Sequence, residues 1–232
     1  MGDRAGKSAL FEEFARVGKA LGSGKRLELL DLLSQGERSV EALAAAAGLG
    51  LSTASAHLQS LRQAGLVTTR REGTRIHYDV AGPDVLRLYS MLRSVARDRV
   101  ADVELKRAAY LGLGGPHGER GEELTREELL ARAQAGAVTV LDVRPGEEYR
   151  AAHIPGAVSI PLDELAARIS ELPERADVVA YCRGAYCRGA YCVLAYDALD
   201  VLRAHGRAGR RLQDGMLEWR LAGLPVESEG AA

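Results

Sequence analysis

Residues Asp177-Val-Val-Ala-Tyr-Cys-Arg-Gly-Ala-Tyr-Cys-Arg-Gly-Ala-Tyr-Cys-Val-Leu-Ala-Tyr-Asp-Ala-Leu-Asp-Val-Leu-Arg203 contain three different sequence patterns in succession. The first five residues form a short apolar run typical of a buried strand, and the residues from Val193 onward have helical spacing. All three cysteines of the chain, Cys182, Cys187 and Cys192, lie between these two runs. We therefore predict that the cysteines occupy a loop between a strand and a helix.

The cysteine loop is repetitive, because the unit Tyr-Cys-Arg-Gly-Ala occurs twice from Tyr181 and begins again at Tyr191. A thiol near a helix N-terminus is favoured as thiolate by the macrodipole and by unpaired backbone N–H groups. This position predicts a nucleophilic sulfur. Three thiolates could instead bind a soft metal such as Zn²⁺ or Cu⁺, but no nearby histidine completes such a site, so no metal is expected.

Helical and strand patterns alternate on both sides of this loop. The expected elements are helices 125–134, 162–171 and 193–204 and strands 138–142, 158–160, 178–181 and 210–212. Such alternation predicts an α/β domain whose parallel sheet is covered by helices on both faces. Ligands of such sheets bind beyond the carboxyl ends of the strands, which is where the cysteine loop begins.

Several strings in this half resemble the rhodanese family of sulfurtransferases. They are Leu141-Asp-Val-Arg-Pro-Gly-Glu-Glu-Tyr149, His153-Ile-Pro-Gly-Ala-Val-Ser-Ile-Pro161, the Cys-Arg-Gly loop, and Asp214-Gly-Met-Leu-Glu-Trp-Arg-Leu-Ala-Gly-Leu-Pro-Val-Glu227. The resemblance implies that a cysteine after a central strand accepts sulfane sulfur from thiosulfate, polysulfide or a persulfide. The resulting persulfide would be held by backbone N–H groups of the loop, with no cofactor.

The repeat departs from the family pattern and leaves the nucleophile open. Counted from the strand, Cys182 has the position of the nucleophile; counted back from the helix, Cys187 has it, with the complete loop running to Cys192. We favour Cys187, because anion stabilisation comes from the loop amides and the helix start. Cys192 would resolve a persulfide into a disulfide or pack at the end of the loop. The candidate catalytic residues are Cys187, Cys182, Arg188, Arg183, Gly189 and Cys192.

Other polar residues in these strings are expected to have structural roles. Asp142 and Arg144 are interpreted as an ion pair at the end of the first strand, and His153 as a residue that fixes a turn. Trp219 is expected in the core. The duplication could also have left a folded but inactive domain, since small displacements of a nucleophile cost much of its rate.

The first half of the chain has a different pattern. Two helices within 8–34 meet at Gly22-Ser23-Gly24, Ser39 caps a short helix to Ala47, and Ser52 is expected to cap a second helix that ends at Gly65. In the second helix Ala54, Leu58 and Leu61 form a buried stripe. Its polar positions are the candidates for reading base edges: Ser52, Thr53, Ser55, His57, Gln59 and Ser60.

A hairpin and a long helix follow. Two strand-like runs within 66–80 meet at Glu72-Gly73, with Arg70, Arg71 and Arg75 near the tip. An amphipathic pattern then predicts one helix from Asp84 towards Ala109. The glycine-rich segment after it predicts the domain organisation: residues 1–110, a linker at 111–123, and residues 124–232.

This order of elements resembles the winged helix-turn-helix of the ArsR-type bacterial regulators. The resemblance rests on Ser39-Val-Glu-Ala-Leu-Ala44, Leu51-Ser-Thr-Ala-Ser-Ala-His-Leu-Gln-Ser-Leu-Arg-Gln-Ala-Gly-Leu-Val67 and the wing Arg70-Arg-Glu-Gly-Thr-Arg75. It implies a homodimer, formed through the first and last helices, that binds double-stranded operator DNA. A winged helix that serves only protein contacts is the alternative. Because His57 and His77 have no ligand-like spacing and the domain has no cysteine, a metal sensor is not expected.

Charge and hydropathy agree with these assignments. Residues 1–110 carry 17 Lys and Arg against 13 Asp and Glu, whereas residues 111–232 carry 14 against 19. Only the basic half suits a polyanion. No apolar window approaches the roughly 18 residues of a membrane span, so we expect a cytoplasmic protein without membrane contact.

The sequence thus predicts a two-domain regulator, a winged helix-turn-helix followed by an α/β rhodanese-like domain, which senses or transfers reactive sulfur. Two alternatives stay open. One is a sulfurtransferase that uses the winged helix mainly for dimerisation, and the other is a repressor with an inert rhodanese domain.

Overall fold

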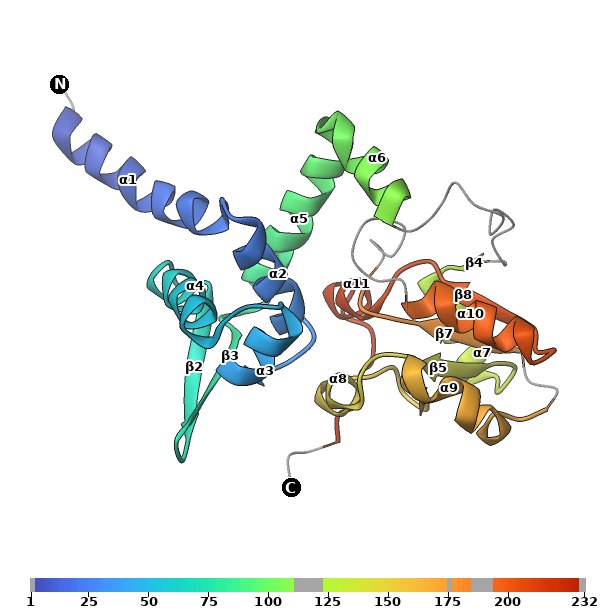
Figure 1. The fold of residues 1–232 in the computed structure, drawn as a ribbon. Coiled ribbons are helices and arrows are strands. Elements are labelled where there is room, and N and C mark those ends of the chain that lie inside the picture. The colour runs from blue at the N-terminus through green and yellow to red at the C-terminus, as the bar shows by residue number, and fades with distance from the viewer. Residues whose placement is uncertain (1–2, 111–122, 175–176, 185–193, 230–232) are drawn as a thin grey trace. The chain divides into compact units, whose positions relative to one another are not determined.

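The computed structural model describes residues 3–110, 123–174, 177–184 and 194–229 (Figure 1). The chain divides into two compact units, Met1–Leu92 and Arg93–Ala232. Each unit has its own core and is described by itself.

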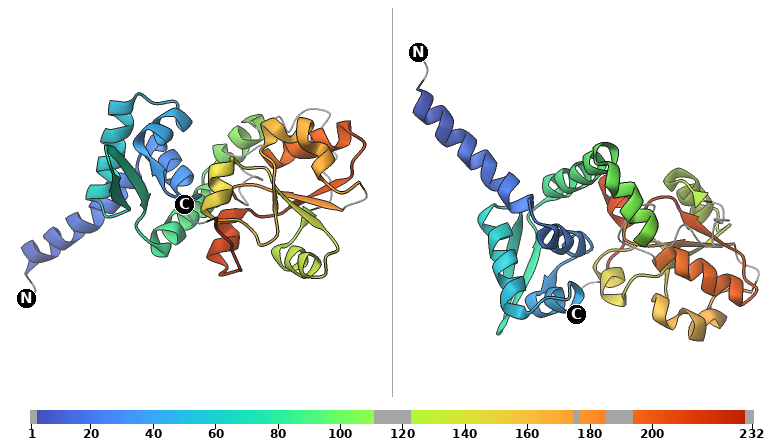
Figure 2. Two further views of the ribbon diagram at one scale, coloured as in Figure 1. Left: turned by 90° about the horizontal axis from the view of Figure 1, so that it is seen from below. Right: turned by 45° about the horizontal axis from the view of Figure 1, so that its top comes forward.

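The N-terminal unit combines helices with a small antiparallel sheet of strand order β1-β3-β2. Its β2–β3 hairpin projects away from the helices (Figures 1 and 2). The elements are α1 (Arg4–Leu21), α2 (Gly24–Leu33), β1 (Arg38–Ser39), α3 (Val40–Ala46), α4 (Leu51–Gln63), β2 (Val67–Glu72), β3 (Arg75–Val80) and the start of α5 (Pro83–Arg99). This arrangement is the predicted winged helix-turn-helix.

Side-chain capping explains the start of α3 but not that of α4. The Ser39 side chain accepts a hydrogen bond from the Ala42 N–H, which confirms it as the cap of α3. The predicted Ser52 cap is wrong. Helix α4 begins at Leu51 after Gly50, so Ser52 already lies inside its first turn. Gly48, with φ of 60°, turns the chain between the two helices.

Two further predictions in this region need correction. The hairpin turns at Gly73-Thr74, since Glu72 pairs with Arg75 and Gly73 has φ of 60°. The single helix predicted from Asp84 to Ala109 is broken at Val100 into α5 and α6 (Ala101–Tyr110). Neither Gly nor Pro marks this break, so hydrophobic spacing alone could not locate it.

The C-terminal unit is built on a five-stranded parallel sheet of order β4-β8-β7-β5-β6, which confirms the predicted α/β fold. Its strands are β4 (Glu123–Leu124), β5 (Thr139–Asp142), β6 (Val158–Ser159), β7 (Val178–Tyr181) and β8 (Gly209–Leu212). Its helices include α7 (Arg126–Gln134), α8 (Gly146–Ala151), α9 (Leu162–Arg168) with a 3₁₀ turn at Ile169–Glu171, α10 (Leu194–Ala204) and α11 (Met216–Leu221). The short elements β4, α8 and α11 were not predicted.

Side-chain alternation along β7 divides the core of this unit into two layers. Val178, Ala180 and Cys182 pack on the side of α9 and α10, whereas Val179 and Tyr181 pack on the side of α7 and α11. The strand is therefore buried on both faces, as a central parallel strand requires. Within the described ranges, no helix is long and apolar enough to cross a membrane.

Candidate functional site

Helix α4 presents the predicted polar face. The stripe Ala54, Leu58 and Leu61 is fully buried, as expected. Ser52 and Thr53 are exposed, and the remaining four candidates of this face are half-buried: Ser55, His57, Gln59 and Ser60. The most accessible short polar side chains of this face therefore lie in the first turn of α4. In helix-turn-helix proteins, the N-terminal residues of the recognition helix are the ones that contact base edges.

Two of the half-buried candidates are engaged within the unit. The Gln59 amide donates to the Tyr78 hydroxyl at 3.1 Å, and Tyr78 is a buried residue of the wing. The Ser60 hydroxyl donates to the Ala56 carbonyl at 3.0 Å. Gln59 thus links α4 to the hairpin, a role that sequence spacing did not indicate.

The wing arginines differ in how they are held. Arg70 donates through Nε and Nη2 to the Glu37 carboxylate, with Nη2 2.5 Å from Oε1, and its Nη1 lies 2.9 Å from Glu72 Oε2. The hydrogen bond from Arg70 lowers the pKa of Glu37 below its usual value. His77 lies 3.7 Å from Glu37 and 3.8 Å from Glu72. Glu37, which sequence analysis missed, therefore fixes one side of the wing.

The other two wing arginines lie at the hairpin tip. Arg71 Nε donates to the Gly73 carbonyl at 3.0 Å, and Arg75 is exposed opposite Glu72. Both guanidinium groups belong to exposed residues and are suited to phosphate contacts. The structure thus brings the predicted recognition helix and the wing together in one unit.

In the C-terminal unit, Cys182 directly follows β7 and its side chain continues the alternation of that strand. It is 1 % exposed and packs among apolar residues that include Leu141, Ile160 and Ala195. Buried cysteines in apolar surroundings behave as small hydrophobic residues and react poorly. Four of the predicted catalytic residues lie outside the described residues: Cys187, Arg188, Gly189 and Cys192.

The first copy of the repeat is held by the start of α11. The Met216 N–H donates to the Cys182 carbonyl and the Leu217 N–H to the Arg183 carbonyl, each at 3.0 Å. Gly215 is needed here because a Cβ atom would collide with the backbone of Gly184. The turn signal Asp214-Gly215 was visible in the sequence, but this close approach was not.

Arg183 also forms an ion pair within the domain. Its Nη2 lies 2.6 Å from Oε1 of Glu148, a residue of α8 that is 1 % exposed. The Glu148 carboxylate is buried, so loss of the Arg183 contact is expected to destabilise this part of the domain. Sequence analysis missed Glu148 because it missed α8, although two glutamates in a first turn are typical of a helix start.

A buried polar network lies beneath this segment. Arg144 Nη2 donates to Asp142 Oδ2 at 2.6 Å, and the Tyr181 hydroxyl donates to the same oxygen at 2.5 Å. Burial, followed by the charge of Asp142, raises the pKa of Tyr181 well above its usual value. Arg144 also donates to the Ala152 carbonyl at 2.8 Å. Asp142 and Arg144 are therefore the structural ion pair that the sequence predicted.

His153 and Trp219 also have the structural roles expected of them. His153 is buried, stacks on Tyr149, and pairs through its backbone with Glu227 near the C-terminus. Trp219 is fully buried, and its indole N–H donates to the Pro225 carbonyl at 2.7 Å. Within the described part of the chain, no group of three or more His, Cys, Asp or Glu residues is arranged to hold a metal ion.

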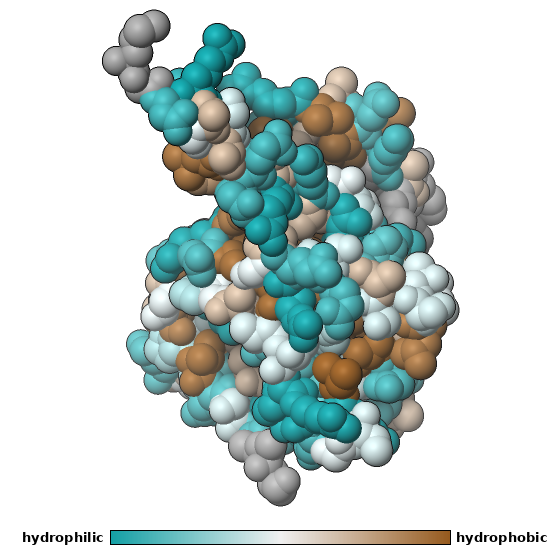
Figure 3. All heavy atoms as spheres, turned by 90° about the vertical axis from the view of Figure 1, so that its left-hand side faces the viewer, coloured by the Kyte–Doolittle hydropathy of each residue, from teal (hydrophilic) through white to brown (hydrophobic). Residues whose placement is uncertain are grey.

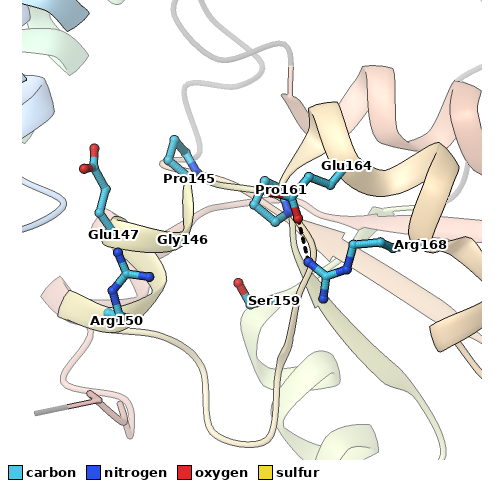
Figure 4. Close-up of a pocket in the computed structure, with 8 residues that line it drawn as sticks. All are labelled: Pro145, Gly146, Glu147, Arg150, Ser159, Pro161, Glu164 and Arg168. Atoms are coloured by element: carbon cyan, nitrogen blue, oxygen red, sulfur yellow. Dashed lines mark hydrogen bonds and ion pairs between the residues drawn. The ribbon is translucent and has the colours of Figure 1, made fainter.

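An open pocket of about 590 Å³ lies at the carboxyl edge of the sheet, beyond β5 and β6 (Figure 4). Helix α8 contributes Gly146, Glu147 and Arg150 to its lining. The opposite wall consists of Ser159 from β6 and Glu164 and Arg168 from α9. Pockets of this size bind small organic molecules.

Comparisons with known proteins agree with both units. The family model "Bacterial regulatory protein, arsR family" matches residues 23–69, and the model "Rhodanese-like domain" matches residues 125–222. The "HTH-type transcriptional regulator Rv0324" of Mycobacterium tuberculosis is 55 % identical over 225 residues, which cover 97 % of this chain and 94 % of that protein. This chain belongs to the ArsR-family regulators with a C-terminal rhodanese-like domain.

Relatives of single domains also match this ArsR-family regulator. A "Sulfurtransferase" of Allochromatium vinosum is 33 % identical over 107 residues, which cover 45 % of the regulator and 91 % of that protein. A solution structure of a homodimeric winged helix-turn-helix domain from Mycobacterium bovis is 55 % identical, with a TM-score of 0.40, and covers 43 % of this chain and 91 % of that one. The family models alone show that the regulator combines an ArsR-type DNA-binding domain with a rhodanese-like domain.

Proposed function

We propose that this regulator acts in the cytoplasm as a homodimer that detects or transfers sulfane sulfur. A loop cysteine takes the outer sulfur of thiosulfate, a polysulfide or an organic persulfide, and the modified loop changes the affinity of the winged helix for operator DNA. The observation that carries the proposal is that one chain joins a DNA-binding unit to a rhodanese-like domain whose cysteine repeat begins at the carboxyl edge of the sheet.

The sulfur step needs only the donor and the protein. The cysteine thiolate attacks the outer sulfur of R–S–SH, a new S–S bond forms on the cysteine, and the old S–S bond breaks with its electron pair leaving as R–S⁻. A second thiolate that attacks the inner sulfur of Cys–S–SH would form a disulfide and release HS⁻. Either product changes the covalent state of the loop without an added oxidant.

Cys187 is the nucleophile that we favour. The burial of Cys182 to 1 % exposure among apolar side chains supports a packing role for that residue. The contacts of Cys182 and Arg183 with α11 and of Arg183 with Glu148 support an anchoring role for the first copy of the repeat. Cys187 then carries the persulfide, with Arg188 and Gly189 in its loop, and Cys192 is available to resolve it.

On the DNA side, we assign base contacts to the start of α4 and phosphate contacts to the wing. Ser52 and Thr53 are exposed at the helix start, and Arg71 and Arg75 are exposed at the hairpin tip. Ser55 and His57 face the same groove further along α4. Arg70 adds a phosphate contact once it is released from Glu37. Gln59 and Ser60 act mainly by holding α4 in position.

A gel-shift assay tests the proposal. A genomic DNA fragment selected by the protein is titrated with wild type and with the variants Cys182→Ser, Cys187→Ser and the double variant, each before and after polysulfide treatment. We expect polysulfide to change the DNA affinity of wild type and Cys182→Ser at least fivefold and to leave Cys187→Ser unchanged. Identical affinity of treated and untreated wild type would refute sulfur sensing, and loss of the response in Cys182→Ser alone would reassign the nucleophile.

A sulfurtransferase enzyme is the second candidate function. The name of the Allochromatium vinosum relative, which matches the rhodanese-like domain over 91 % of its length, favours it. Thiosulfate:cyanide sulfurtransferase turnover without selection of any DNA fragment would support this reading. A DNA-binding protein that forms no persulfide with any donor would instead be a repressor with an inert appended domain.

A further inference from the structure

We propose that the pocket between α8, β6 and α9 binds the organic part of a small persulfide donor that carries a carboxylate, with Arg150 as its cationic contact. The proposal rests on the proposed function, because it names the donor class for the same sulfur chemistry. Arg150 has no role in the sulfur step proposed above, and it takes no part in the buried network of Asp142, Arg144 and Tyr181.

The pocket and the cysteine repeat begin at the same edge of the sheet, on strands that are separated by β5 alone. Ser159 lies at the end of β6, where it pairs with Asp142, and Asp142 in turn pairs with Tyr181 at the end of β7. Cys182 follows Tyr181 directly. A molecule in the pocket is therefore held at the same edge of the sheet from which the repeat starts, two strands away.

The charges of the pocket select an anion at one end. Arg168 on the α9 wall is already neutralised, with 2.7 Å to Glu164 and 2.6 Å to Glu171. The Arg150 guanidinium makes no ion pair or hydrogen bond with a described residue, and it lies 3.3 Å from the position that a Cβ atom on Gly146 would take. An arginine fork of this kind matches the geometry of a carboxylate.

The remaining lining suits an organic ligand. Figure 4 shows Glu147 directed away from Ser159, so the wall opposite Arg150 offers a hydroxyl group to a ligand. The rings of Pro145 and Pro161 add apolar surface. A volume of about 590 Å³ is far larger than thiosulfate or a short polysulfide requires, and it fits a thiol of peptide size.

Binding of this kind would orient the donor for the transfer already described. For transfer to occur, the S–SH end of a donor held at Arg150 must reach the cysteine repeat that follows β7, two strands from β6. The thiolate of the loop takes the outer sulfur, and the organic thiolate leaves with the electron pair of the broken S–S bond. The pocket then discriminates among organic persulfides by the group that it binds, whereas inorganic donors react at the cysteine without occupying the pocket.

Persulfide formation on the full-length protein tests this assignment, with mass spectrometry of the cysteine peptide as the readout. The probes are glutathione persulfide, which carries carboxylates, and inorganic polysulfide, which does not. We expect Arg150→Glu to raise the half-saturating concentration of glutathione persulfide about tenfold or more, as loss of a charge-assisted contact predicts. The rate with polysulfide should be unchanged, and Arg150→Lys should lie between wild type and Arg150→Glu, because lysine keeps the charge and loses the fork.

Arg203→Glu is the matched control, because Arg203 is an exposed arginine of the same domain that pairs with Asp200 and does not line the pocket. Titration calorimetry with reduced glutathione adds a readout that does not depend on sulfur transfer. Equal effects of Arg150→Glu and Arg203→Glu, or equal effects of Arg150→Glu on both donors, would overturn the pocket assignment and leave the proposed function standing. Binding of glutathione that is lost in Arg150→Glu, without persulfide on any donor, would uphold the pocket and refute the sulfur chemistry.

Discussion

At the scale of single residues, Glu37 holds Arg70, a wing arginine that we assign to DNA contacts. Its carboxylate receives Arg70, whose guanidinium also reaches Glu72. The pKa of Glu37 is lowered in the folded protein by its hydrogen bond with Arg70. The stability that this ion pair adds is therefore fully present above the pKa of an unfolded glutamate, and it is lost as the pH falls through the lowered pKa of Glu37. At neutral pH, Arg70 is therefore divided between Glu37 and any phosphate that approaches the wing.

We predict that Glu37→Gln increases DNA affinity severalfold at low salt, because Arg70 then becomes available to phosphate. The slope of log K against log salt should steepen by about 0.9, as for one additional phosphate contact. Fluorescence anisotropy over a salt series measures both quantities. Glu28→Gln, which removes the same charge from an exposed pair with Lys25 on α2, is the control. Equal or weaker binding by Glu37→Gln would mean that Glu37 holds Arg70 in its DNA-binding position.

At the scale of secondary-structure elements, the sequence predicted most long segments and missed short ones. The stripe of Ala54, Leu58 and Leu61 has helical spacing along α4, and the β7 run is apolar throughout; both predictions were confirmed. Helices α8 and α11 have six residues each, which is too short for an apolar period to emerge. Contacts between distant segments, such as Arg183 with Glu148, leave no local sequence pattern. This part of the site could therefore be found only from the structure.

Helix α1 carries an exposed apolar stripe that supports the predicted dimer. Leu10, Phe11 and Phe14 are 53 %, 58 % and 59 % exposed, and the two phenylalanine rings meet edge to face at 5.7 Å. Figure 3 shows apolar side chains near the N-terminal end among hydrophilic ones. An apolar cluster of this kind on one helix is typical of a protein interface.

We predict that Phe14→Glu weakens the dimer at least tenfold, since it places a charge in an apolar interface. Analytical ultracentrifugation over a concentration series measures the dissociation constant. Ile76→Glu is the control, because Ile76 is an apolar residue of the wing with 42 % exposure. If both variants keep the wild-type dissociation constant, or if wild type is monomeric throughout the series, α1 does not form the interface.

At the scale of the whole molecule, the two halves have opposite electrostatic character. The basic half contains the recognition helix and the wing, and the acidic half contains the cysteine repeat. Because the acidic half is not attracted to DNA, the cysteine loop has to act on DNA binding indirectly. The thiol and persulfide forms of the loop must therefore favour different states of the DNA-binding unit. A structural link of this kind is an equilibrium property and must act in both directions.

Coupling between persulfide formation and DNA binding has to act in both directions. If persulfide formation changes the affinity for a selected DNA fragment by a given factor, saturating DNA must change the equilibrium constant for sulfur transfer by the same factor. Full-length protein is equilibrated with fixed ratios of glutathione persulfide to glutathione, with and without the fragment, and persulfide occupancy is measured by mass spectrometry. We expect the midpoint ratio to shift by the factor found in the gel shift. A random-sequence duplex of equal length, at a concentration that leaves the protein unbound, is the control and should not shift it. A gel shift that responds to sulfur while the midpoint stays fixed would show that the two events do not share one equilibrium, and would point instead to damage of the DNA-binding unit by the donor.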